Sequence, residues 1–119
     1  MKVVYYLESC NTCKKILNKI QLPKDIIYRE LKKNPIIESE LNELYLVSKS
    51  YESLLNKRAK LYQEYKLKDK NLSDDEYKKY LLEHYTFLNR PIFLFENNIF
   101  IGNSEKNIQS LGTFLSNEF

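Results

Sequence analysis

The segment "YYLESCNTCKK" contains Cys10 and Cys13, the only two cysteines among the 119 residues of the chain. Two thiols at this spacing can form a reversible disulfide, can supply half of a zinc site, or can simply pack as small apolar side chains. A structural zinc site needs about four ligands. The chain offers only one histidine, His84, on what reads as a separate helix, so no metal is expected.

The residues on either side of the pair predict a strand followed by a helix. The apolar run at 2–7 is typical of a buried strand, and Ile16, Leu17 and Ile20 then fall on one side of a helix. A second strand is expected over 25–31, after Pro23, which gives a right-handed βαβ unit with parallel strands. A CxxC that opens the helix of such a unit is typical of thioredoxin-like proteins.

This position predicts different roles for the two thiols. The thiolate is the reactive form of cysteine, and the unpaired N–H groups of a first helical turn stabilise an anion. Cys10, just before the helix, is therefore the expected nucleophile. Cys13 lies one turn further along and is expected to be buried, where it can attack a mixed disulfide formed at Cys10 and release the partner.

Residues 36–88 read as an almost wholly helical block. Helices are expected over 36–48 and 54–65, and a third begins at Ser73, where "SDDE" places Glu76 as the second half of a capping box.

The last part of the chain returns to strands. The runs "RPIFLF" and "NIFIG" predict a hairpin across residues 96–98, and an amphipathic helix is expected from 104 to about 115. The order is βαβ, a helical insertion, then ββα, which is an α/β arrangement with a mixed sheet.

The composition predicts one soluble cytoplasmic domain over residues 1–119. The apolar fraction is 43%, which suits a globular core, yet no apolar run approaches the length of a membrane span or a signal-peptide core. Cysteines in the reducing cytoplasm are more often catalytic or redox-sensing than structural. The net charge of +3 is small and the two signs are interleaved, so no direct nucleic-acid partner is expected.

Four segments together resemble the ArsC/Spx family: "SCNTCKK", "LLNKRAK" at 54–60, "LNRPIFL" at 88–94 and "FIGNSE" at 100–105. This family comprises arsenate reductases, related glutathione-linked reductases and the Spx transcription regulators. The resemblance implies a thioredoxin-like fold with a core formed by 1–35 and 89–119, and with the helical insertion 36–88 between the second and third strands. It also implies a cis Arg90-Pro91 bond that holds Arg90 beside Cys10.

The resemblance further implies which residues bind substrate. Arg90 and Arg58 match the arginines that hold an oxyanion, although the alignment can also place Asn56 at the second position. Pro91 and the loop residues Asn11 and Thr12 are expected to complete the substrate site. A guanidinium suits this task because it can bind an oxyanion with two hydrogen bonds.

The resemblance leaves two functions open. Tyr6 stands where glutaredoxin-dependent reductases carry a histidine, and Cys13 where they usually carry a serine. The leading interpretation is a cytoplasmic thiol-disulfide oxidoreductase acting on a small oxyanion or a thiol/disulfide substrate. It would have no bound cofactor, and glutathione, glutaredoxin or thioredoxin would be its reductant. The alternative is a redox-sensing regulator that binds RNA polymerase, although "LVSKSYESLL" lacks the glycine that Spx proteins use there.

Overall fold

The computed structural model describes residues 1–118 and divides them into two compact units. Unit 1 contains residues 1–34 and the chain from Arg90 onward, and unit 2 contains Pro35–Asn89. That the two units form one domain stays a prediction. None of the helices in residues 1–118 has the length and apolar character needed to cross a membrane.

A mixed four-stranded sheet in the order β2-β1-β3-β4 forms the centre of unit 1. β1 pairs in parallel with β2 and antiparallel with β3, which in turn pairs antiparallel with β4. In register, Val4 lies between Tyr28 on one side and Phe93 on the other. The predicted mixed sheet, with a helical insertion between its second and third strands, is confirmed. The strands are β1 Lys2–Tyr6, β2 Ile27–Glu30, β3 Ile92–Phe95 and β4 Asn98–Ile101.

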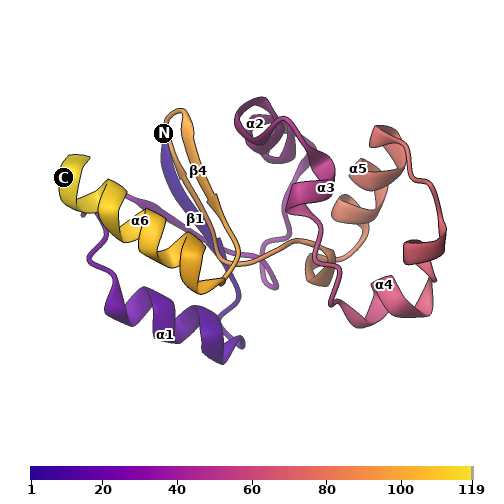
Figure 1. Cartoon of the computed structure of the whole chain (residues 1–119), viewed down its shortest axis with the longest axis horizontal. Coiled ribbons are helices and arrows are strands. Elements are labelled where there is room, and N and C mark those ends of the chain that lie inside the picture. Colours follow the sequence, from indigo (N-terminus) through magenta and orange to yellow (C-terminus); the bar gives the residue numbers. More distant parts are fainter. Residues whose placement is uncertain (119) are drawn as a thin grey trace. The chain divides into compact units, whose positions relative to one another are not determined.

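Two helices, α1 (Asn11–Lys19) and α6 (Glu105–Glu118), cover the same face of this sheet (Figure 1). Their apolar side chains pack with those of the strands in one buried cluster, because burial removes apolar surface from water. The cluster contains Val4, Ile16, Ile26, Phe93, Phe95, Leu111 and Leu115. All four residues of β3 are buried, which explains why "IFLF" is continuously apolar rather than alternating.

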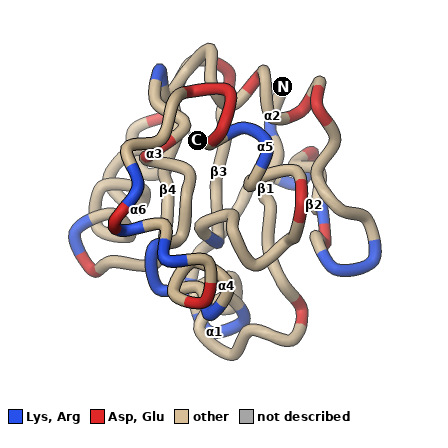
Figure 2. Tube along the Cα trace, turned by 90° about the vertical axis from the view of Figure 1, so that its right-hand side faces the viewer, with Lys and Arg blue, Asp and Glu red and all other residues tan. Residues whose placement is uncertain are grey.

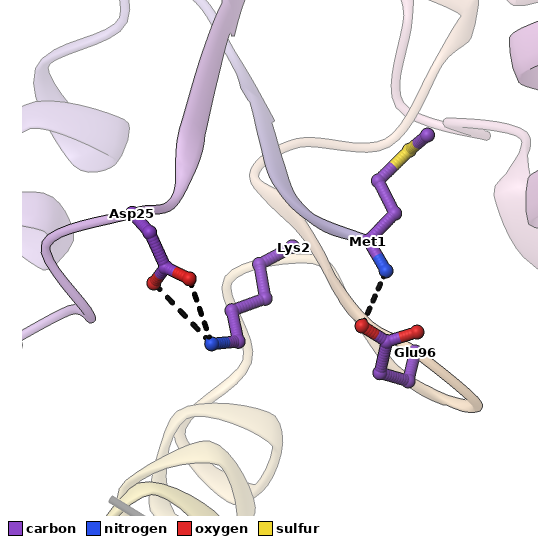
Figure 3. Close-up of polar contacts among 4 residues, drawn as sticks. All are labelled: Met1, Lys2, Asp25 and Glu96. Atoms are coloured by element: carbon purple, nitrogen blue, oxygen red, sulfur yellow. Dashed lines mark hydrogen bonds and ion pairs between the residues drawn. The ribbon is translucent and has the colours of Figure 1, made fainter.

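Polar contacts fix the start of β1 (Figure 3). The Lys2 ammonium donates to both carboxylate oxygens of Asp25, at 3.0 and 3.3 Å, and the amino group of Met1 pairs with the Glu96 carboxylate. Asp25 therefore lies at the beginning of β1. The cysteine loop follows the other end of that strand.

The hairpin between β3 and β4 is confirmed, but its turn has two residues rather than three. Asn98 pairs with Phe95 in the sheet, which leaves Glu96 and Asn97 in the turn. Glu96 adopts a left-handed conformation with φ of 52°, as tight hairpin turns of this length require. The Arg90-Pro91 bond is cis, as predicted.

Unit 2 is helical, as expected, but the single helix predicted over 54–65 is wrong. One short helix ends at Leu54 and the next begins only at Lys60, and Asn56 makes the turn between them, where its side-chain oxygen accepts the Arg58 N–H at 3.0 Å. Asparagine competes with helix formation through such local bonds. The Asn56 N–H also donates to the Phe87 carbonyl at 2.7 Å. The elements are α2 Glu38–Ser48, α3 Tyr51–Leu54, α4 Lys60–Glu64, α5 Asp74–Glu83 and the 3₁₀ helices η1 Leu67–Asp69 and η2 Tyr85–Phe87.

The predicted capping box at the start of α5 is confirmed. The Ser73 hydroxyl accepts the Glu76 N–H at 3.3 Å, and the Glu76 carboxylate accepts the Ser73 N–H at 3.1 Å. We expect Ser73→Ala to lower the free energy of unfolding by about 1 kcal/mol, because an N–H of the first turn then loses its partner. Chemical denaturation followed by helical circular dichroism measures this. Ser110→Ala, at an exposed position in α6, should change stability by about 0.5 kcal/mol or less. Equal changes in the free energy of unfolding for the two substitutions would show that the Ser73 cap does not stabilise the protein.

Candidate functional site

Cys10 occupies the N-cap of α1, directly after the turn that follows β1. Its N–H donates to the Leu7 carbonyl and its own carbonyl accepts the Lys14 N–H, both at 3.1 Å. Cys10 is partly buried, whereas Cys13 is completely buried, as expected. Both cysteines are free thiols, and they approach each other to 3.4 Å.

The surroundings of the two sulfurs push their pKa values in opposite directions. Burial raises the pKa of Cys10, but hydrogen bonds from the N–H and thiol of Cys13, the charge of Arg90 and the Thr12 N–H outweigh it. The pKa of Cys10 is therefore lowered. Burial is the main reason that the pKa of Cys13 rises to about 11. At neutral pH Cys10 is the thiol that ionises more readily, and Cys13 stays protonated beside it.

Arg90 and Pro91 begin the segment that leads into β3. Arg90 is partly buried and lies close enough for its charge to lower the pKa of Cys10. Pro91 is buried, and its carbonyl accepts the Gly102 N–H at 2.9 Å. The Gly102 carbonyl accepts a hydrogen bond from the Asn107 side chain at 2.8 Å. Gly102 has φ of 90°, a conformation that favours glycine. These two hydrogen bonds connect the Arg90-Pro91 segment to the residues between β4 and α6.

The remaining predicted residues fall in both units. Asn11 and Thr12 are the exposed first residues of α1, and Thr12 contributes its N–H to the Cys10 sulfur. Unit 1 thus brings Cys10, Cys13 and Arg90 together with this loop. Arg58 is an exposed residue of unit 2, in the turn between α3 and α4. Its part in anion binding stays a prediction.

Sequence reasoning missed Glu30, which holds the loop before the cysteines. One carboxylate oxygen accepts the Glu8 N–H at 2.9 Å and the other accepts the Lys33 N–H at 2.8 Å. Partial burial raises the pKa of Glu30, but these backbone bonds outweigh that effect and lower it, so the side chain stays ionised. A lone glutamate at the end of a strand carries no local pattern, so only the folded structure reveals this role.

The charge of Arg90 should be measurable in the reactivity of Cys10. In Arg90→Gln the positive charge is lost, the pKa of Cys10 rises, and alkylation of Cys10 by iodoacetamide at pH 7 should slow by about two- to fivefold. The rate is measured by mass spectrometry of the Cys10 peptide. Lys106→Gln, an exposed residue of α6, is the matched control and should leave that rate unchanged. An unaltered rate in Arg90→Gln would show that the charge of Arg90 does not affect the reactivity of Cys10.

The sheet order, and the dithiol at the start of the helix after β1, define an α/β protein of the thioredoxin-like class. The chain belongs to the ArsC family, whose model matches residues 5–111. The membership inferred from the four sequence segments is therefore confirmed.

Individual relatives include both a regulator and reductase-like proteins. The global transcriptional regulator Spx 2 of Bacillus anthracis is 30% identical over 127 residues, which cover 99% of this chain and 95% of that protein. Among solved structures, a "possible arsenate reductase" from Streptococcus mutans UA159 is 25% identical with a TM-score of 0.70, and covers 93% of this chain and 97% of that one. An ArsC family related protein from Bacteroides fragilis is 20% identical with a TM-score of 0.72, covering 92% and 96%.

Proposed function

We propose that this protein is a cytoplasmic thiol-disulfide oxidoreductase of the ArsC family, with Cys10 as its nucleophile and Cys13 as its resolving thiol. The proposal rests on the opposite pKa shifts of two cysteines that approach each other to 3.4 Å. A nucleophile must ionise near neutral pH, while a resolving thiol must stay close without competing for the substrate. Two cysteines that merely pack against each other would need no such difference.

The exchange proceeds in two steps. The Cys10 thiolate attacks one sulfur of a substrate disulfide, forming a mixed disulfide and expelling the other sulfur as a thiolate, which takes a proton from water. Cys13 then loses its proton, attacks the Cys10 sulfur and expels the second substrate thiolate. The substrate gains two electrons and two protons, and the protein is left with a Cys10-Cys13 disulfide. Two thiols, from two glutathione molecules or from the dithiol of glutaredoxin or thioredoxin, restore the Cys10-Cys13 dithiol and are themselves oxidised to a disulfide.

The substrate is a disulfide or a small oxyanion such as arsenate. For an oxyanion, Arg90 and Arg58 would supply positive charge, and Asn11, Thr12 and Pro91 would shape the loop that receives it. Both substrate classes need an ionised Cys10.

Side-by-side turnover assays test the proposal. Purified protein is given arsenate, a glutathione mixed disulfide or a protein disulfide, with reduction coupled to NADPH through glutathione reductase and glutaredoxin or through thioredoxin reductase and thioredoxin. We expect turnover of at least one substrate that is lost in Cys10→Ser. If no substrate turns over above the rate of Cys10→Ser, the protein is not an oxidoreductase of this kind.

A second candidate function is a redox-sensing transcription regulator. The observation that favours it is the 30% identity to a global transcriptional regulator over almost the whole of both chains. In this case the Cys10-Cys13 pair is a switch, and the helical insertion binds RNA polymerase. Capture of polymerase subunits from a lysate by the reduced and the oxidised protein tests this. Capture that depends on the redox state supports the regulator, and its absence in both states, together with turnover, supports the enzyme.

A further inference from the structure

The basic residues of this chain are concentrated in its first 34 residues. This segment has eight basic residues against three acidic ones. In the rest of the chain acidic residues slightly outnumber basic ones. The basic residues are Lys2, Lys14, Lys15, Lys19, Lys24, Arg29, Lys32 and Lys33, and the acidic ones are Glu8, Asp25 and Glu30. The excess therefore belongs to the segment that contains both thiols.

A charged groove lies directly beside the cysteine loop. It has a volume of about 250 Å³ and is formed by the loop before Cys10, the first turn of α1 and the end of β2. Ser9, which precedes Cys10 in the chain, is part of its wall. The full lining is Glu8, Ser9, Lys14, Glu30, Lys32 and Lys33. Cys10 itself is not in this lining, but it directly follows Ser9, so the groove begins one residue away from the cysteine that a substrate must reach.

The two carboxylates of the groove are already engaged within unit 1. Both oxygens of Glu30 accept backbone N–H groups, and the Glu8 carboxylate pairs with the Lys33 ammonium at 3.5 Å. Among residues 1–118, neither Lys14 nor Lys32 forms an ion pair. Figure 2 shows basic residues in the loop after β2 and along α1. Three lysines against two glutamates leave the groove with an excess of one positive charge, and Lys14 and Lys32 are the lysines that an external carboxylate can pair with.

We infer that this groove binds an acidic peptide segment next to the disulfide of a protein substrate. The inference rests on the proposed oxidoreductase function and names the substrate class of the same site. Extended chain advances about 3.3 Å per residue, so the first few residues beside the substrate cysteine fall within reach of Lys14 and Lys32. Carboxylates there are attracted to the groove before reaction, which raises the rate of encounter, while lysines are repelled.

Two activated peptides test the inference. Each has a single cysteine as a mixed disulfide with 2-thiopyridine, flanked by three glutamates or by three lysines on each side. The second-order rate constant of thiopyridone release is measured with the Cys13→Ser protein, because Cys10 is then its only thiol. This rate constant is divided by the one for the same peptide with 2-mercaptoethanol, which carries no charge other than that of its reacting thiolate. We expect the acidic peptide to react about tenfold faster than the basic one at low ionic strength. At about 0.5 M salt the ratio should fall to about two or less.

Charge-reversed variants locate the effect. In the Cys13→Ser background, Lys14→Glu with Lys32→Glu should abolish or invert the preference. The matched control is Lys19→Glu with Lys24→Glu, which makes the same change in charge. These two residues lie at the end of α1 and just before Asp25, at the far end of β1 from the thiols. The control should keep most of the preference. Because each result is a ratio for one protein, a change in the pKa of Cys10 cancels.

The outcomes separate the two proposals. Failure of Cys13→Ser to react with either peptide overturns the oxidoreductase and the groove together. Equal rates for both peptides overturn the groove alone, because exchange at Cys10 is then intact. A preference that survives in Lys14→Glu with Lys32→Glu also overturns the groove, since the selecting charge would lie elsewhere.

Discussion

The Cys13→Ser protein should accumulate as a covalent adduct when it is exposed to oxidised glutathione. Cys10 is expected to attack the disulfide as it does in the native protein, but no second thiol is present to complete the exchange. Intact mass spectrometry should show one glutathionyl group per chain, on the Cys10 peptide. The native protein, treated in the same way, should pass through this adduct and end as the Cys10-Cys13 disulfide.

Cys10→Ser is the matched variant, and we expect it to form adducts at least about 100-fold more slowly. The remaining thiol is completely buried, and burial is the main reason its pKa is raised to about 11. Very little thiolate is then present at pH 7. An adduct that builds up on Cys13 in this variant, at a rate close to that of Cys13→Ser, would contradict the assignment of the nucleophile.

In the native protein, iodoacetamide at pH 7 should label Cys10 at least about tenfold faster than Cys13. The pKa of Cys10 lies below the ordinary value of 9.0 and that of Cys13 is about 11. This gap favours the Cys10 thiolate about 100-fold at pH 7. The more basic thiolate is intrinsically the better nucleophile, which offsets about tenfold of that ratio. Burial of Cys13 adds to the selectivity.

The pH dependence of labelling provides a second readout of the same difference. Labelling of Cys10 should rise with pH and level off at a lower pH than labelling of an ordinary cysteine, because its pKa is lowered. Labelling of Cys13 should keep rising toward pH 11. Peptide mapping at each pH follows both sites in one sample. Coincident profiles for the two cysteines would show that their surroundings do not distinguish them.

The features predicted correctly from the sequence are those encoded by neighbouring residues. The run "IFLF" predicts a buried strand because all its side chains are apolar, and "SDDE" predicts a helix start because both partners of the cap lie within one turn. The cysteine pair is likewise local: a strand before it and an amphipathic helix after it are enough to place Cys10 at the helix start.

The features that were missed depend on contacts between distant segments. The helix predicted over 54–65 begins only at Lys60, because the backbone of Asn56 pairs with Phe87, thirty-one positions away. The support of the cysteine loop by Glu30 arises in the same way, from the folded arrangement of β2 beside β1. No local pattern in the sequence reports such contacts.

The most direct test of Cys10 and Cys13 as a redox pair is the intact mass of the native protein after mild oxidation and removal of the oxidant. We predict a monomer that has lost two hydrogens, with Cys10 and Cys13 linked in the peptide map, and recovery of the original mass on reduction. The spacing of the two thiols at the start of α1 allows this bond to close within one chain. A product linked between chains, or a monomer in which both thiols remain free, would contradict the claim.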